Sequence, residues 1–132
     1  MKCWGHNLSA QVGTGEVTTN EPAPRTVSGI STAGRSIATG SFHTCTVIPS
    51  GSVRCWGSNT DGRLGDGTTT HRILPITVSG ISDVIEVAAG ASHTCALRAT
   101  GAVLCWGLNA NGQIGDASTV SRSTPVGVVV YG

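Results

Sequence analysis

Aromatic and charged side chains are scarce in this chain of 132 residues, which has three Trp, one Tyr and one Phe, and only 11% Asp, Glu, Lys and Arg. The formal net charge is +1 and no run of basic residues occurs, which argues against electrostatic binding of nucleic acid. The apolar run at 126–131 is far too short to cross a bilayer. We therefore expect neither a nucleic-acid partner nor a membrane-spanning segment.

Other common signals are also missing. Met1 and Lys2 lead directly into the first motif, so we expect no signal peptide within this sequence. No segment has the apolar period of a helix, and no Gly-rich segment opens one, so a phosphate-binding loop has no support. Gly is abundant instead, with 19 residues, and the 39% of apolar residues are enough for a core. We expect one domain, from which a signal peptide has been removed or which is a piece of a longer protein.

The most informative pattern is a set of motifs that recur about every 50 residues. Cys-Trp-Gly occurs at 3–5, 55–57 and 105–107, His-Thr-Cys at 43–45 and 93–95, and Thr-Val-Ser-Gly-Ile at 26–30 and 77–81. A fixed period of this size indicates a repeat architecture, in which each unit buries its apolar side against a neighbour.

Each repeat is predicted to contain four short β-strands. In the last copy, runs of β-branched and small residues bounded by Gly and Ser predict strands at 84–89, 94–98, 102–106 and 125–128. Four short strands per unit are typical of β-propeller blades, so the predicted fold is all-β, with about two and a half blades of four antiparallel strands. Within this one repeat domain we place the outer half of an incomplete blade at 1–28, a complete blade at 29–80 and a second complete blade at 81–132.

Two pairs of cysteines are spaced ten residues apart, Cys45 with Cys55 and Cys95 with Cys105. A hairpin with a three-residue loop ending in Gly sets the members of each pair directly opposite each other, roughly 4.5 to 5.5 Å apart at Cα, within the range of a disulfide. We therefore expect two disulfides. Two alternatives remain: reduced cysteines buried as small hydrophobic residues in a reducing compartment, and a zinc site, although the usual CxxC spacing is absent.

Cys3 aligns with Cys55 and Cys105, but no cysteine stands ten residues before it. We interpret this as a chain that begins inside a hairpin whose first strand is missing. The sequence does not fix the redox state of Cys3.

Histidine and tryptophan recur with the repeats. His43 and His93 occupy the same place in successive copies, so we interpret them as structural residues, for example bonding a neighbouring backbone carbonyl, and not as catalytic ones. Trp4, Trp56 and Trp106 recur likewise, and large flat side chains between packed blades would bury much area.

Acidic residues gather in the Gly-rich segments, at Asp61, Asp66 and Asp116. These segments superficially resemble calcium loops but lack the final bidentate carboxylate of an EF-hand, so we interpret the three as turn residues, with calcium binding as the alternative. No Ser/His/Asp set escapes duplication by the repeats. We assign no catalytic, cofactor-binding or metal-binding residue and expect no cofactor.

The repeated residues resemble the repeats of the regulator of chromosome condensation superfamily. The matching residues are Cys55-Trp56-Gly57-x-Asn59-x-x-Gly62-Arg63-Leu64-Gly65-Asp66-Gly67, then Pro75-x-x-Val78, then Val87-Ala88-Ala89-Gly90-x-x-His93-Thr94-Cys95-Ala96-Leu97. The resemblance implies a β-propeller, which in complete members usually has seven blades. The cysteine pair is similar to that of bacterial secreted or surface members, which implies an extracellular or cell-surface location. The first copy departs at Ala10, where Gly62 and Gly112 stand, so we expect that loop to be built differently.

Members of this superfamily have very different functions, and the fold alone does not choose among them. We expect a non-enzymatic protein-interaction scaffold that acts through loops on one propeller face and is either a piece of a larger propeller or self-associates through its open edges. The alternatives are a guanine-nucleotide exchange factor-like regulator of a small GTPase, a secreted inhibitor or adhesin, and a secreted hydrolase or lyase whose site lies in further blades. An aromatic inhibitory surface would have only Phe42 and Tyr131 outside the Trp-Gly motif.

Overall fold

The computed structural model describes residues 1–130, and the regular secondary structure in this range consists of ten β-strands. Three antiparallel sheets follow one another along the chain, one of two strands and two of four strands. Tyr131 and Gly132, the end of the unit predicted at 81–132, lie outside the described residues. In residues 1–130, no helix is long and apolar enough to cross a membrane.

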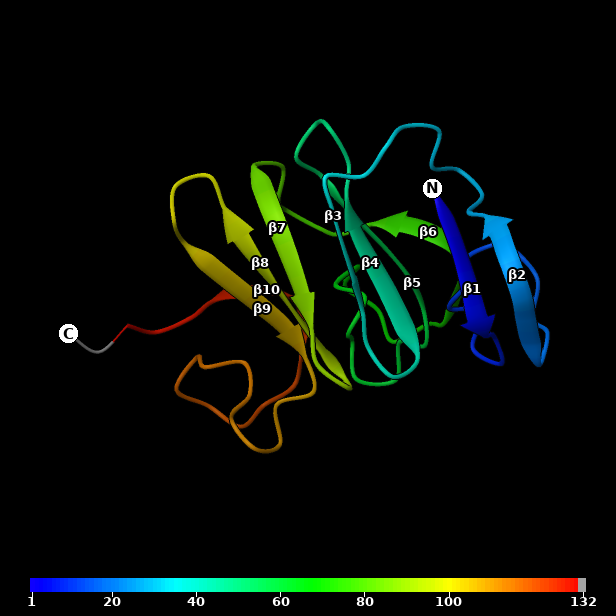
Figure 1. Ribbon diagram of the computed structural model, residues 1–132. Coiled ribbons are helices and arrows are strands. Elements are labelled where there is room, and N and C mark those ends of the chain that lie inside the picture. The colour runs from blue at the N-terminus through cyan, green and yellow to red at the C-terminus, as the bar shows by residue number, and fades with distance from the viewer. Residues whose placement is uncertain (131–132) are drawn as a thin grey trace.

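The sheets are built from strands in simple sequential order (Figure 1). The first sheet contains β1 (Lys2–His6) and β2 (Asn20–Thr26). The second contains β3 (Ser36–Thr39), β4 (His43–Val47), β5 (Val53–Gly57) and β6 (Arg72–Thr77). The third contains β7 (Val84–Ala89), β8 (His93–Arg98), β9 (Val103–Gly107) and β10 (Arg122–Gly127). The prediction of an all-β partial propeller with four-stranded blades is confirmed.

The central hairpin of each complete blade has the predicted register. Cys45 pairs with Cys55 and Cys95 pairs with Cys105 across adjacent antiparallel strands. Gly51 closes the first of these hairpins with a φ of 86°, a left-handed conformation that Gly adopts without steric cost. The turn chemistry therefore fixes which residues of the hairpin point to the same face of the blade.

Proline marks the outermost strand of each sheet. Pro22 and Pro24 lie in β2, Pro75 in β6 and Pro125 in β10, and each of these strands has a neighbour on one side only. Pro has no N–H to donate to a second neighbour, so an edge position is the one it tolerates in a sheet. The strand predicted to start at 125 begins three residues earlier, at Arg122, which pairs with Gly107 of β9.

The two complete blades stack face to face through one shared core. β7 packs against β3 and β4 of the preceding blade, so the two sheets lie side by side at the middle of the molecule (Figure 1). Eleven buried residues form this core: Cys45, Val47, Val53, Cys55, Leu64, Val78, Ile81, Val84, Val87, Ala96 and Trp106. A smaller cluster of Val27, Ile30 and Trp56 joins the β1–β2 pair to the second sheet.

Candidate functional site

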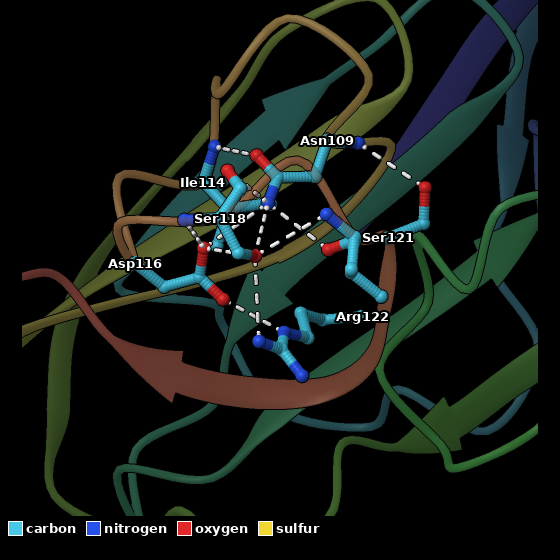
Figure 2. Close-up of polar contacts among 7 residues, drawn as sticks. Asn109, Ile114, Asp116, Ser118, Ser121 and Arg122 are labelled. Atoms are coloured by element: carbon cyan, nitrogen blue, oxygen red, sulfur yellow. Dashed lines mark hydrogen bonds and ion pairs between the residues drawn. The ribbon is translucent and has the colours of Figure 1, made fainter.

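Every unit carries a long loop between its Cys-Trp-Gly strand and its outer strand, and a buried asparagine organises it. In the last blade this residue is Asn109, which is fully buried. Its Oδ1 accepts the backbone N–H of Ile114 at 2.9 Å, and its Nδ2 donates to the carbonyl of Ser118 at 3.1 Å (Figure 2). A third bond joins Nδ2 to the carbonyl of Val120 at 3.0 Å. One amide side chain thus satisfies backbone groups that regular structure would otherwise satisfy.

Asp116 forms the second layer of this loop. Its Oδ1 accepts bonds from the backbone N–H and the hydroxyl of Ser118 at 3.0 and 2.7 Å, and from Asn109 Nδ2 at 3.1 Å (Figure 2). Its Oδ2 pairs with Nε of Arg122 at 2.7 Å. The Ser118 hydrogen bond, followed by those from Arg122 and Asn109, lowers the pKa of Asp116 to about 2. The carboxylate is therefore charged, and both of its oxygens are engaged within the fold.

The middle blade repeats this arrangement around Asn59. Asp66 accepts from Thr68 and from Asn59 and pairs with Arg72. Burial opposes ionisation of Asp66, but the hydrogen bonds from Thr68, Arg72 and Asn59 outweigh it and lower its pKa. Asp61, on the same loop, pairs with Arg63 at 2.9 Å. All three predicted turn aspartates thus lie in the long loops, each with an arginine partner. In residues 1–130, no group of three or more His, Cys, Asp and Glu side chains is placed to hold a metal ion.

The first loop also links its buried asparagine to a carboxylate that pairs with an arginine, but the carboxylate comes from a different position. Thr14 stands where Asp66 stands, and Asn7 donates to the hydroxyl of Thr18 at 3.0 Å. That hydroxyl donates to Glu21, which is 6% exposed and pairs with Arg25. The acidic residue therefore comes from β2 instead of from the loop itself.

The turn at Ala10 corrects one prediction. Ala10 has a φ of 58° and donates its N–H to Asn7 O, just as Gly62 donates to Asn59 O and Gly112 to Asn109 O. The expectation that the first loop is built differently at this residue is therefore wrong. Ala adopts the left-handed conformation here at a steric cost of about 1–2 kcal/mol, and the loops differ only further along.

Tryptophan and glycine form the joint between blades. The ring of Trp56 covers Gly13 of the preceding loop, where a Cβ would lie 2.5 Å from Nε1. Trp56 Nε1 donates to the carbonyl of Gln11 at 2.8 Å, and the hydroxyl of Thr44 donates to the same carbonyl at 2.8 Å. Because a side chain at Gly13 would displace the ring, the joint requires a glycine at this point.

The next joint repeats these contacts with one difference. Trp106 covers Gly65, and the hydroxyl of Thr94 donates to the carbonyl of Arg63 at 2.9 Å. Trp106 Nε1, however, is buried without a hydrogen-bond partner among the described residues. Trp56 and Trp106 are both fully buried, as predicted for side chains between blades, whereas Trp4 is 63% exposed.

His43 extends the second joint across the blades. It is fully buried, and its Nε2 lies 2.9 Å from the hydroxyl of Thr94. Since that hydroxyl gives its proton to Arg63 O, His43 must donate through Nε2, with Nδ1 deprotonated. Burial, with smaller contributions from Arg63 and His93, lowers the pKa of His43 to about 4. His43 thus bonds a neighbouring hydroxyl, where a backbone carbonyl was suggested.

His93 lies at the matching place of the last blade and is half-buried. Burial lowers its pKa as well. Its ring packs against Gly90 as that of His43 packs against Gly40. The two histidines differ in that a following blade covers His43.

The cysteines form the two expected disulfides. Cys45 is bonded to Cys55 and Cys95 to Cys105, each with Cα atoms 4.1 Å apart. Cys3 is a free thiol, half-buried against the cluster of Val27, Ile30 and Trp56. Burial raises the pKa of this thiol.

The sequence alone predicts no role for the buried asparagines. Asn7, Asn59 and Asn109 are all fully buried, and each bonds the N–H five residues later. The signal was present, because Asn follows the Trp-Gly motif at the same distance in all three copies.

Stacked sheets of four antiparallel strands, joined by a tryptophan from each blade on a glycine of the one before, define a β-propeller repeat protein. Two family profiles, both of the regulator of chromosome condensation (RCC1) repeat, match the sequence, one at 35–63 and 84–113 and the other at 50–97. Together they cover more than half of the chain, which belongs to the RCC1 repeat family.

Solved structures show the same fold. Prp20p of Saccharomyces cerevisiae, described with its binding to Gsp1p and histones, matches with a TM-score of 0.86 and 21% identity over 98% of this chain and 34% of that chain. Human WBSCR16 matches with a TM-score of 0.83 and 24% identity over 96% and 34%. A crystal structure of Kap60 bound to yeast RCC1 (Prp20) gives 0.80 and 20% over 98% and 33%. The chain therefore spans about a third of the length of these structures.

Proposed function

We propose that this chain is a non-enzymatic protein-interaction scaffold. The observation that carries the proposal is that the recurring polar side chains form structural hydrogen bonds within and between the units. Asn109 and Asp116 organise the long loop, and His43 bonds Thr94 across the blades. Side chains that would suggest acid–base chemistry are thus committed to holding the blades and loops in place.

The long loops supply the recognition surface. Leu8 and Val17 on the first loop and Val120 on the third are 57%, 58% and 60% exposed. Apolar side chains that a rigid loop holds in solvent suit contact with another protein. Related structures are described with protein partners too, Gsp1p and histones for Prp20p and Kap60 for yeast RCC1, which supports the same class of partner.

An exchange assay tests the scaffold against the GTPase-regulator alternative. Small GTPases loaded with fluorescent GDP are mixed with the chain, and release of the nucleotide is followed over time. We expect the release rate to stay at its spontaneous value for every GTPase tried. A catalytic increase that scales with the amount of chain would overturn the non-enzymatic proposal.

The scaffold also associates with copies of itself in this proposal. Val103 is 40% exposed on the open face of the last blade, whereas Val53 at the same place in the middle blade is fully buried. Trp4 is exposed at the other end of the stack. The blade-to-blade contact occurs twice within the chain, and its two sides are different surfaces. One end of the stack exposes one side of this contact and the other end exposes the other side, which favours head-to-tail association.

Sedimentation of the chain tests this association. We expect a mass that rises with concentration, and a Trp4→Ser variant that stays monomeric because it lacks the ring that docks between blades. Ile73→Ser, an exposed position on the outer strand β6 of the middle blade, is the control and should associate normally. A wild-type chain that remains monomeric at all concentrations would contradict the proposal.

An extracellular or cell-surface location belongs to the same proposal. Two disulfides support it, since such bonds persist mainly in oxidising compartments. Alkylation of the denatured chain, recovered from its own cells with thiols blocked at lysis, should modify Cys3 alone. Modification of all five cysteines would place the chain in a reducing compartment.

A further inference from the structure

One ionisable side chain lies inside the contact between the two complete blades. His43 is fully buried there, and its Nε2 donates to the hydroxyl of Thr94 in the last blade. That hydroxyl donates in turn to the backbone carbonyl of Arg63. A single chain of hydrogen bonds therefore joins β4, β8 and the long loop of the middle blade.

The surroundings of His43 have no place for a second proton. Its Nδ1 is buried and has no hydrogen-bond partner among the described residues. The side chain of Arg63 is also buried, and its positive charge acts on the ring. Asp61 is already engaged with Arg63 at 2.9 Å. Protonation of His43 in place would therefore bury a donor without an acceptor beside an existing cation.

The other charged groups around His43 do not offset this charge. His93 of β8 disfavours protonation of His43 as well. From the first unit, Lys2 and His6 line the hollow that also reaches His43, and neither carries a negative charge. On β7, Glu86 is exposed and lines the open face of the last blade instead. Among the described residues, no element packed against His43 supplies an ionic partner for its proton.

The interior of each blade, by contrast, depends on bonds that do not titrate in mild acid. The disulfides Cys45–Cys55 and Cys95–Cys105 each close the central hairpin of one blade. In the long loops, Asp66 and Asp116 have lowered pKa values and keep their charge. Mild acid should therefore weaken the contact between the blades before it weakens the blades themselves.

We propose that the contact between the middle and last blades is a pH-sensitive joint, which opens in mild acid as His43 meets water and takes up a proton. Opening breaks the bond to Thr94, separates Trp106 from Gly65 of the middle loop, and exposes part of the shared core. The inference goes beyond the scaffold proposal and does not depend on it, because it concerns how the loops are held and needs no partner.

The two protonation equilibria give the size of the effect. His43 has a pKa of about 4 in the closed joint, against an ordinary value of 6.5 when water reaches it. Between pH 7 and pH 5 the exposed imidazole gains its proton, whereas the buried imidazole remains neutral. The equilibrium between the open and closed joint should therefore shift toward the open form by about twentyfold.

Hydrogen exchange measured by NMR tests the joint, since it detects openings that are rare. The reporters are two N–H groups that donate across the joint, Ser41 to the carbonyl of Ala91 and Gly67 to the carbonyl of Ser123. After correction for the intrinsic pH dependence of exchange, their protection should fall about twentyfold between pH 7 and pH 5.

Two N–H groups within single blades are the references. Ile48 donates to the carbonyl of Ser52 in the middle blade, and Arg98 donates to the carbonyl of Ala102 in the last. Their protection should change by less than about twofold over the same range. A parallel fall in reporters and references would mean that the whole chain unfolds, and constant protection in the reporters would mean that the joint does not respond. Either result would overturn the proposal.

Two variants identify the group responsible. His43→Gln keeps an N–H donor for Thr94 but does not titrate, so most of the pH dependence of the reporters should disappear. His71→Gln makes the same change at an exposed histidine of the middle loop and should leave the fall intact. A fall that persists in His43→Gln, or that disappears in His71→Gln, would refute control of the joint by His43.

A measurement on the unaltered chain decides the question even if His43→Gln does not fold. Nitrogen chemical shifts of the histidine rings report the charge and the tautomer of each imidazole. At pH 5 the ring of His43 in the native chain should still be neutral, with its proton on Nε2. A ring that is already protonated at pH 5 in the closed joint would remove the driving force for opening and overturn the proposal.

Discussion

His43 is held neutral by its surroundings. It is fully buried between two blades, donates to Thr94 through Nε2, and has a pKa lowered to about 4. The unfolded chain, with an ordinary histidine pKa near 6.5, binds the proton more tightly. Protons therefore favour the unfolded state between these two values.

This predicts a pH window for stability. The free energy of unfolding should rise by on the order of 3 kcal/mol between pH 4 and pH 6.5 because of His43. Lowering the pH through this range should remove the same amount. Urea unfolding at a series of pH values measures it. Asp66 and Asp116 act in a separate window, since their lowered pKa values place their loss of stabilisation below pH 4.

A glutamine at this position is the control. His43→Gln keeps an N–H donor for Thr94 but does not titrate, so most of the decline between pH 6.5 and 4 should disappear. Part of it should remain, because His93 is also half-buried with a lowered pKa. An unchanged pH profile would show that His43 does not control this window.

Individual residues were predicted unevenly by the sequence. The cysteine pairs followed from spacing and hairpin geometry alone, and they are bonded as predicted. The burial of Asn109 was not predicted, because a Gly/Asn/Asp-rich segment reads as a solvent-exposed turn. Burial of a polar side chain depends on backbone groups up to eleven residues away, such as the carbonyl of Val120, which local patterns do not specify.

The long loop of the last blade contains an unfavourable backbone conformation. Ala117 has a φ of 63°, whereas Gly67 at the same place in the middle blade has a φ of 82°. Ala117 is exposed, so its methyl group gains little from packing. The loop therefore bears the cost of a left-handed alanine without compensation from burial.

Reciprocal substitutions test this conformation. Ala117→Gly should stabilise the chain by about 0.5–1 kcal/mol, the relief of strain less the greater freedom of Gly in the unfolded state. Gly67→Ala should destabilise it by a similar amount, since a Cβ there meets nothing closer than 3.8 Å and strain is the main effect. Thermal unfolding of both variants measures the difference. Changes of the same sign in both would contradict it.

The strands themselves were predicted well, with errors at their ends. The predicted strand 84–89 matches β7 (Val84–Ala89), while β10 starts at Arg122 and not at 125. Alternation and Gly boundaries locate a strand paired on both sides. An outer strand is defined by its partner, and Arg122 pairs with Gly107 across a register shift that no local pattern contains.

The stacking of blades depends on contacts at glycine. Gly65 lies under Trp106, where a Cβ would be 2.7 Å from Nε1, whereas no tryptophan of the described chain covers Gly115 at the same place in the last loop. Their φ values, 72° and 73°, are nearly identical. The two positions therefore differ in packing between blades and not in backbone strain.

Alanine at these two positions should separate the effects. Gly65→Ala should destabilise the chain by about 1–3 kcal/mol more than Gly115→Ala, because only the first forces a buried ring to move. Denaturant unfolding followed by Trp fluorescence measures both variants. Equal destabilisation would mean that Trp106 does not lock the blades together.

The stacking of units was predictable from the sequence, whereas the exposure of each copy was not. Three nearly identical motifs predicted three equivalent tryptophans, yet Trp56 and Trp106 are buried and Trp4 is exposed. The motif determines what a residue is able to contact, and its position in the stack determines whether a neighbour is there. Every copy of a repeat therefore specifies the contacts that its residues are able to make, but no copy specifies whether a neighbouring blade is present.

The joint between blades has a consequence for how the repeats diverge. The acceptors that receive Thr44 and Thr94 are main-chain carbonyls, those of Gln11 and Arg63. A carbonyl is the same whichever side chain its residue bears, so a glutamine and an arginine serve equally well. Mutation is therefore free to change the exposed side chains of each unit while the hydrogen bonds between blades persist. Duplicated copies are able to acquire different binding partners without loss of the common framework.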